Sequence, residues 1–137
     1  MEKDGLDMIE VYIDGAAKGN PGLSGAGIFI KSGEGQERYS IPLGVHDNHA
    51  AEYLALIHAL RICQEKGYED IISVRTDSRH VADAVEKEFV KKEPYRSLLA
   101  EALALASAFP LFFIKWIPES QNKTADQLSR EAIRKNA

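Results

Sequence analysis

The chain has 137 residues, the size of a single domain with a hydrophobic core of its own. Its 45% hydrophobic and 28% charged residues fit an ordinary globular protein, and no apolar run approaches the length of a membrane span. The formal net charge of −4 argues against a protein that coats nucleic acid by bulk positive charge. A site that reaches phosphates through bound metal stays open, because carboxylates that hold a metal are themselves negative.

The ends of the chain and its cysteine content set further limits. The first seven residues are polar and acidic, and they show no secretory or transit signal. Cys63 is the single cysteine, so neither an intramolecular disulfide nor a cysteine-based zinc cluster is available. We therefore expect one domain over residues 1–137 and a cytoplasmic protein. We expect no membrane association and no obligate protein partner, and hence a monomer.

Strand and helix patterns follow one another in an order typical of an α/β domain. Three strands come first with short turns between them, which predicts an antiparallel meander. Later strands arrive through helical crossovers, so they are expected to run parallel to the first, within a mixed sheet. The predicted strands are Met8–Asp14, Gly25–Lys31, Gln36–Pro42, Ile71–Thr76 and Leu111–Ile117, and the predicted helices are Ala50–Lys66, Ser78–Glu88, Tyr95–Ala108 and Asn122–Lys135.

Two carboxylates follow the ends of predicted strands. Asp14 ends the first strand before a glycine-rich segment, and Asp77 directly follows Ile71–Thr76. Each has a simpler interpretation, since Asp14 with Gly15 suits a hairpin turn and Asp77 suits a helix N-cap. If the fourth strand lies beside and parallel to the first, however, the two strand ends are neighbours about 5 Å apart. That edge is where open α/β sheets place their ligands.

Two further carboxylates lie near the starts of predicted helices. Glu52 falls on the same helical row as the apolar Leu56 and Ala59, which predicts that it points inward. Asp126 falls in the first turns of the last helix. A simpler interpretation is again available, because acidic residues near a helix N-terminus are favoured by the helix dipole.

The four carboxylates carry more information together than singly. If the two helices start near the sheet edge of Asp14 and Asp77, they bring Glu52 and Asp126 to the same place. Four carboxylates packed together repel one another unless a cation is present. An all-oxygen set is what Mg²⁺ prefers, and two such ions about 3.5–4 Å apart form the clamp used in nuclease and polymerase chemistry.

Four motifs together resemble those of type 1 ribonuclease H, and the resemblance covers about residues 9–133. It is nearest to the compact bacterial and archaeal branch that has no added hybrid-binding domain. The resemblance implies the ribonuclease H-like fold, with a five-stranded mixed sheet of strand order 3-2-1-4-5 flanked by helices. The motifs are Tyr12–Gly15 with Gly19–Gly22 and Gly25–Gly27, then Asn48–Leu56, Thr76–Ser78 and Asn122–Leu128.

This resemblance implies an endoribonuclease that hydrolyses the RNA strand of RNA/DNA hybrids by two-metal-ion catalysis, leaving 5′-phosphate and 3′-hydroxyl ends. Asp14, Glu52, Asp77 and Asp126 would be the catalytic residues and would hold two Mg²⁺ ions, for which Mn²⁺ can substitute. A hydrogen bond to the 2′-hydroxyl is what tells RNA from DNA at such a site. The nucleic-acid contacts that the resemblance implies are Gly15, Asn20, Asn48, Ser78 and Asn122.

The sequence also departs from the family pattern. The loop Pro118–Gln121 lacks the histidine of the best-known members, and Glu119 is the candidate to replace it in proton transfer or product release. Asp47 stands where a threonine usually grips a DNA-strand phosphate, and His49 replaces a second asparagine. The alternative is therefore a catalytically weak or silent nucleic-acid-binding protein of the same fold. A proofreading-type exonuclease is disfavoured, because its first motif needs a Glu where this chain has Ala16.

Overall fold

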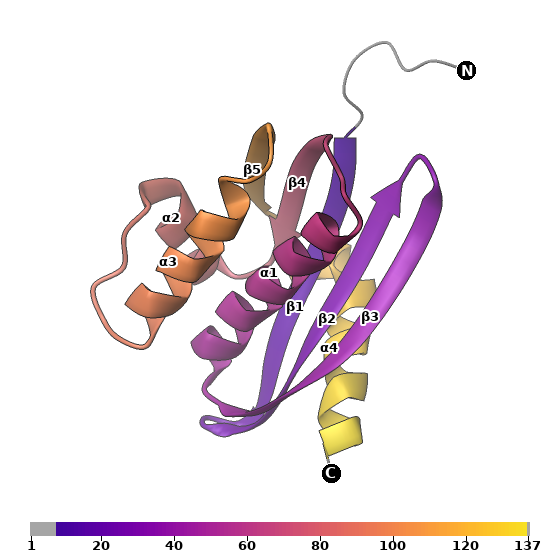
Figure 1. The fold of residues 1–137 in the computed structure, drawn as a ribbon. Coiled ribbons are helices and arrows are strands. Elements are labelled where there is room, and N and C mark those ends of the chain that lie inside the picture. The colour runs from indigo at the N-terminus through magenta and orange to yellow at the C-terminus, as the bar shows by residue number, and fades with distance from the viewer. Residues whose placement is uncertain (1–7, 137) are drawn as a thin grey trace.

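A computed structural model describes residues 8–136 and shows a five-stranded sheet with helices on both faces (Figure 1). The polar segment 1–7, which shows no targeting signal in the sequence, lies outside the described residues. The strands are β1 (Met8–Gly19), β2 (Gly22–Ser32), β3 (Gly35–His46), β4 (Ile71–Thr76) and β5 (Leu111–Trp116). The helices are α1 (Asn48–Glu65), α2 (Arg79–Lys87), α3 (Tyr95–Ala106), the short 3₁₀ helix η1 (Glu119–Gln121) and α4 (Lys123–Asn136).

The sheet has the predicted topology. The strand order is β3-β2-β1-β4-β5, in which β2 is antiparallel to β1 and β3, and β4 and β5 run parallel to β1. Figure 1 shows α1 and α3 on one side of the sheet and α4 on the other. The core lies mainly between the sheet and α1, where Val11, Ile72 and Leu56 are fully buried. None of the helices within residues 8–136 is long and apolar enough to cross a membrane.

The first three strands are longer than predicted, and this corrects the position of Asp14. We expected the first strand to stop at Asp14, but β1 continues to Gly19 and pairs with β2 throughout, from Glu10 opposite Lys31 to Gly19 opposite Gly22. The glycines that suggested a turn are mostly extended, and of those in β1 only Gly19 has a positive φ, at +104°. Asp14 is therefore not at a strand end.

Asp14 instead marks the place where β1 loses one of its neighbouring strands. The pairing of β1 with β4 ends at Ile13, which lies opposite Thr76. From Asp14 onward β1 keeps β2 as its neighbour on one side and loses β4 on the other. The predicted neighbourhood of Asp14 and Asp77 is therefore present, because each residue follows the last pair of the parallel ladder. The second and third strands, predicted as Gly25–Lys31 and Gln36–Pro42, are also extended at both ends.

Helix α4 lies directly on the backbone of β2. A Cβ atom at Gly27 would stand 1.9 Å from the carbonyl oxygen of Ala125, and one at Gly25 would stand 2.4 Å from that of Ser129. No side chain fits at either position, so the two glycines determine how closely α4 approaches the sheet.

Gly27→Ala is expected to lower the free energy of unfolding by about 3 kcal/mol, because the new methyl group would meet backbone atoms that move only with α4. Urea denaturation followed by circular dichroism measures the loss. Gly67→Ala is the matched control, since Gly67 has open space around it and a φ of +71°. Its cost comes from the backbone alone and is about 1 kcal/mol. Equal losses in the two variants would contradict the steric argument.

Candidate active site

Asp14 and Asp77 are held beside each other by the side chains of Asn122 and Trp116. Asn122, just before α4, donates from Nδ2 to the carbonyl oxygen of Ile13 at 2.8 Å and to Oδ2 of Asp77 at 3.3 Å. Trp116, at the end of β5, donates from Nε1 to the carbonyl oxygen of Asp77 at 3.1 Å. These bonds fix the ends of the β1–β4 and β4–β5 ladders to the start of α4.

Asp14 is the most buried of the four carboxylates, with 9% of its surface exposed. Burial raises its pKa from an ordinary value near 3.8 to about 7. Ser129 of α4 opposes this rise by donating from Oγ to Oδ2 of Asp14 at 2.6 Å. The charges of Asp77, Asp126 and Glu52 add to the rise, so these three carboxylates lie close enough to influence Asp14.

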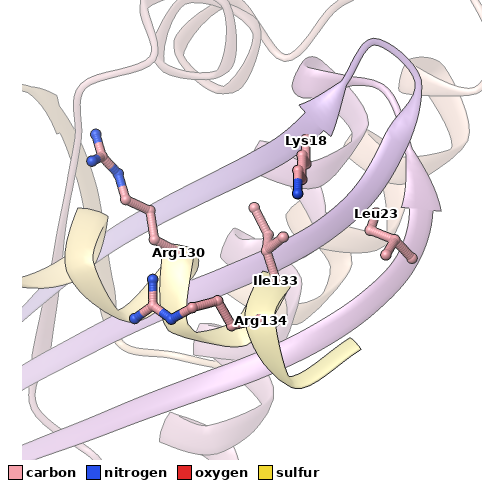
Figure 2. Close-up of a pocket in the computed structure, with 5 residues that line it drawn as sticks. All are labelled: Lys18, Leu23, Arg130, Ile133 and Arg134. Atoms are coloured by element: carbon pink, nitrogen blue, oxygen red, sulfur yellow. The ribbon is translucent and has the colours of Figure 1, made fainter. Parts of the chain in front are cut away.

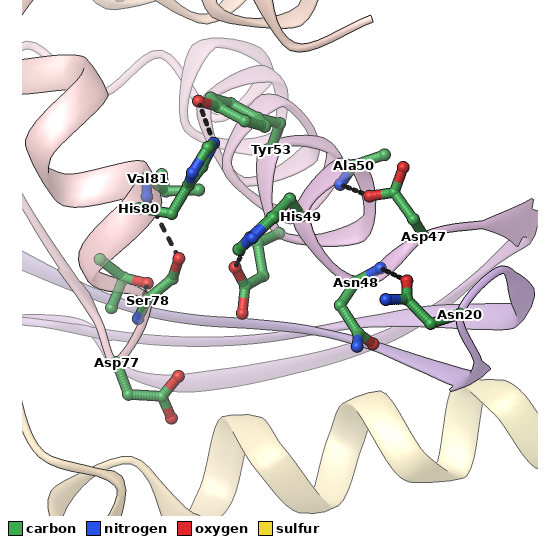
Figure 3. Close-up of polar contacts among 12 residues, drawn as sticks. Asn20, Asp47, Asn48, His49, Ala50, Tyr53, Asp77, Ser78, His80 and Val81 are labelled. Carbon is green, nitrogen blue, oxygen red and sulfur yellow. Dashed lines mark hydrogen bonds and ion pairs between the residues drawn. The ribbon is translucent and has the colours of Figure 1, made fainter. Parts of the chain in front are cut away.

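Glu52, in the first turns of α1, faces the same centre. Burial raises its pKa, and the charge of Asp77 raises it further, whereas Ser78 and His49 lower it. His49 Nδ1 lies 3.7 Å from Oε2 of Glu52. The His49 ring in turn stacks on His80, at 4.1 Å between ring centroids, and His80 Nε2 lies 2.9 Å from the hydroxyl of Tyr53 (Figure 3). Glu52 is thus supported on one side by a stack of two imidazole rings.

Asp77 is half-buried, and it lies beside the buried Asn122. Burial raises the pKa of Asp77, Asn122 lowers it, and the charges of Glu119 and Asp126 raise it. Asn122 is 1% exposed, and its Oδ1 has no hydrogen-bond partner among the described residues. Glu119 is exposed and begins η1, so the segment predicted as a loop at 118–121 contains one helical turn.

Asp126 lies in the first turn of α4 and is more accessible than the other three carboxylates. Its side chain is 40% exposed and pairs with Arg130, at 3.2 Å between Oδ2 and Nη2. An exposed pair at this spacing contributes little to stability. Asp126 is therefore held loosely and is free to take another cationic partner.

The start of α1 explains one of the departures from the family pattern. Asp47 is the N-cap of α1, where its Oδ1 accepts from the backbone N–H of Ala50 at 2.8 Å (Figure 3). The aspartate thus has a local structural role at the position where the family usually has a threonine that grips a DNA-strand phosphate. Asn20, in the β1–β2 turn, accepts from the backbone N–H of Asn48 at 3.0 Å, and both asparagines are exposed.

The remaining predicted contact residues are buried. Gly15 packs against α1, where a Cβ would stand 2.2 Å from the carbonyl oxygen of Ala51, so its glycine is explained by packing. Ser78 is 7% exposed and caps α2 by accepting from the backbone N–H of Val81 at 3.1 Å. Ser78 and Asn122 thus contact Glu52 and Asp77, and a direct contact of either with nucleic acid stays a prediction.

Three supporting residues were not found from the sequence, namely Trp116, His80 and Ser129. Neither Trp116 nor His80 belongs to a motif that marks it as part of the site. Ser129 had one usable signal, since it stands three positions after Asp126 and so faces the same side of a helix. Its contact with Asp14, 115 residues earlier in the chain, depends on how α4 docks.

The carboxylates fit a hard divalent cation that is shared with a ligand. Every candidate donor is an oxygen, as Mg²⁺ and Mn²⁺ prefer. Within residues 8–136, however, no three His, Cys, Asp or Glu side chains are gathered tightly enough to hold an ion alone. Mg²⁺ usually keeps several waters and takes the rest of its ligands from substrate phosphate, so this spacing suits it. A cation at this place would oppose the part of the rise in the pKa of Asp14 that comes from the neighbouring carboxylates.

Comparisons with known proteins agree with this geometry. Residues 12–132 match the family model described as reverse transcriptase-like. A protein named putative hydrolase EbsB from Enterococcus faecalis is 42% identical over 130 residues, which are 93% of this chain and 96% of that protein. Ribonuclease HI of Halobacterium salinarum is 33% identical over 128 residues, and the chain spans 64% of its length.

Solved structures give the same result. The crystal structure of RNase H1 from Halobacterium salinarum aligns with a TM-score of 0.87 at 31% identity, covering 94% of this chain and 99% of that one. LC11-RNase H1 in complex with an RNA/DNA hybrid also aligns with a TM-score of 0.87 at 31% identity, covering 93% and 98%.

The metal-free protein is expected to lose stability as the pH rises from about 4 to about 7. Asp14 ionises near 3.8 when unfolded and near 7 when folded, so the folded state binds more protons in this window. The loss is on the order of 4 kcal/mol at pH 7 and above. Urea denaturation in EDTA at several pH values measures it. Asp14→Asn should flatten the curve, and an unchanged slope in that variant would contradict the assignment.

Ser129→Ala is expected to raise the pKa of Asp14 further, because it removes the hydroxyl that stabilises the charged carboxylate. The direct measurement is the carbon chemical shift of the Asp14 carboxyl as a function of pH, recorded in EDTA. Ser97→Ala, on the exposed side of α3, serves as the control and should leave the titration unchanged. A titration midpoint in Ser129→Ala at or below that of the parent would exclude this role.

Proposed function

Since the chain belongs to the ribonuclease H family of metal-dependent nucleases, we propose that it hydrolyses the RNA strand of RNA/DNA hybrids. The products would carry 5′-phosphate and 3′-hydroxyl ends. One observation carries the proposal: the charges of Asp77, Asp126 and Glu52 all act on the buried Asp14. Such repulsion lowers stability in a protein without a cation to bind, and its presence here supports metal-dependent chemistry.

The residues that would hold two Mg²⁺ or Mn²⁺ ions are Asp14, Glu52, Asp77 and Asp126. When bound, the ions would supply the positive charge that activates a water and stabilises the departing 3′ oxygen. The chain's part is to hold the carboxylates ready. Ser129 donates to Oδ2 of Asp14, and Asn122 donates to Oδ2 of Asp77. The side chains of the two aspartates are therefore already ordered when substrate arrives.

RNA would be distinguished from DNA at the Asn20–Asn48 pair. Asn20 Oδ1 holds the backbone of Asn48, and both side chains are exposed at the turn beside the start of α1. The Asn48 amide can donate to a 2′-hydroxyl, which only the RNA strand carries. Glu119 is exposed, and its charge raises the pKa of Asp77, which supports a role beside that carboxylate in proton transfer or product release.

Purified protein is expected to cut an end-labelled RNA/DNA hybrid internally in Mg²⁺ or Mn²⁺, and to leave single-stranded RNA and duplex DNA intact. Asp77→Asn should slow cutting at least a hundredfold, on the order expected when a metal site loses a ligand. Asp83→Asn changes an exposed aspartate of α2 in the same way and should leave the rate unchanged.

Mass analysis of the fragments reads the end groups. Folded protein that binds the hybrid but cuts it with neither metal would overturn the enzymatic proposal. That outcome would favour the silent hybrid-binding alternative.

A further inference from the structure

A second group of charged residues lies between α4 and the β1–β2 hairpin. Lys18 on the hairpin and Arg130 and Arg134 on α4 surround a cavity of about 300 Å³, which we call the cationic pocket (Figure 2). Leu23 and Ile133 complete its lining, and the surface between the charges is almost entirely apolar. The volume is at the lower end of the range for ligand pockets.

The charge of the cationic pocket is only partly compensated within the protein. Arg130 pairs with Asp126, but neither Lys18 nor Arg134 has a carboxylate partner among the described residues. The whole chain has a net charge of −4, so three cations around one apolar hollow are a local exception. Cations gathered in this way favour an anionic ligand with a less polar body.

The cationic pocket lies at the end of two rows of residues that start at the carboxylates. Along β1 side chains alternate, so Lys18 is on the same face as Asp14 and about 13 Å from it, at about 3.3 Å per residue. Along α4, Arg130 and Arg134 follow Asp126 at four-residue steps on one face, and Arg134 is about 12 Å along the axis. Lys18 and Arg134 are thus at nearly the same distance from the carboxylates of their own elements.

The path between the two sites follows an open strand edge. Beyond Ile13, β1 no longer pairs with β4, so its outer edge is free of another strand in the described part of the chain. Along the axis of a duplex each strand rises about 3.4 Å per nucleotide, so 12–13 Å along that axis corresponds to three or four nucleotides.

We propose that the cationic pocket is a backbone-binding subsite for the cleaved RNA strand, three to four nucleotides from the cleaved phosphate. The guanidinium and ammonium groups would take a phosphate, and the apolar lining formed by Leu23 and Ile133 would contact the less polar face of a sugar. This inference rests on the proposed function, because it takes the carboxylates as the place of cleavage.

The test compares two charge-matched double variants on hybrids of defined length. Lys18→Ala/Arg134→Ala removes two cations of the pocket, and Lys115→Ala/Arg38→Ala removes two exposed cations from β5 and β3. The main cut is first mapped on a long hybrid with the parent protein. Shortened hybrids then keep either two or eight nucleotides beyond that cut, on the 5′ side or on the 3′ side.

For the pocket variant on the long hybrid, KM is expected to rise about tenfold with kcat unchanged, and the dependence of log KM on log salt should fall by one to two. The rise in KM should disappear on one of the two hybrids that keep only two nucleotides beyond the cut. The β5/β3 variant should match the parent within twofold on every substrate.

Four outcomes are distinguishable. A pocket variant that matches the parent, an equal penalty in both variants, or an equal penalty on all lengths would each overturn the subsite while leaving the proposed function intact. Absence of cutting by the parent itself would overturn the proposed function, and the subsite with it. The same assay in Asp77→Asn protein, read as hybrid binding, separates lost affinity from lost chemistry.

Discussion

The rest of the site depends on the direct contact between α4 and the backbone of β2. Gly25 and Gly27 have no side chains, and the helix occupies the space that a Cβ would need. The helix carries Asp126 and the Ser129 hydroxyl to Asp14, and it follows directly on Asn122, which joins Ile13 to Asp77. Residues from three distant parts of the chain therefore become one site through a packing contact that itself includes no charged group.

The carboxylates could be predicted from the sequence because each follows a recognisable local signal. Asp77 directly follows an apolar strand, which places it at the sheet edge. Glu52 lies on the buried row of a long helix, so helical periodicity predicts that its side chain points inward. The supporting residues could not be predicted in the same way. Ser129 and Trp116 act through contacts that depend on docking across the sheet. The length of β1 was mispredicted because glycines suit both turns and extended strands next to a closely packed helix.

The departures from the family pattern gain a physical meaning from the structure. Asp47 would repel a phosphate, yet it caps α1, so the start of the helix that carries Glu52 is fixed by this residue. His49 lies beside Glu52 and stacks on His80, which places imidazole groups at the side of α1 that carries Glu52. The loop before α4 lacks a histidine, and it presents Glu119 to Asp77. The residues around the four carboxylates thus depart from the family pattern, while the charges of Glu52, Asp77 and Asp126 all act on Asp14.

The change of neighbours along β1 divides a single strand into two parts of unequal stability. From Glu10 to Ile13 the strand has partners on both sides, and from Asp14 to Gly19 it has one. Backbone groups with one partner strand open at a lower free-energy cost than groups held on both sides. The part of β1 that follows the parallel ladder and includes Asp14 is therefore the part that deforms most easily, and the doubly paired part before it deforms least. The twelve consecutive residues of β1 thus include both a rigid part and a part that can adapt its shape.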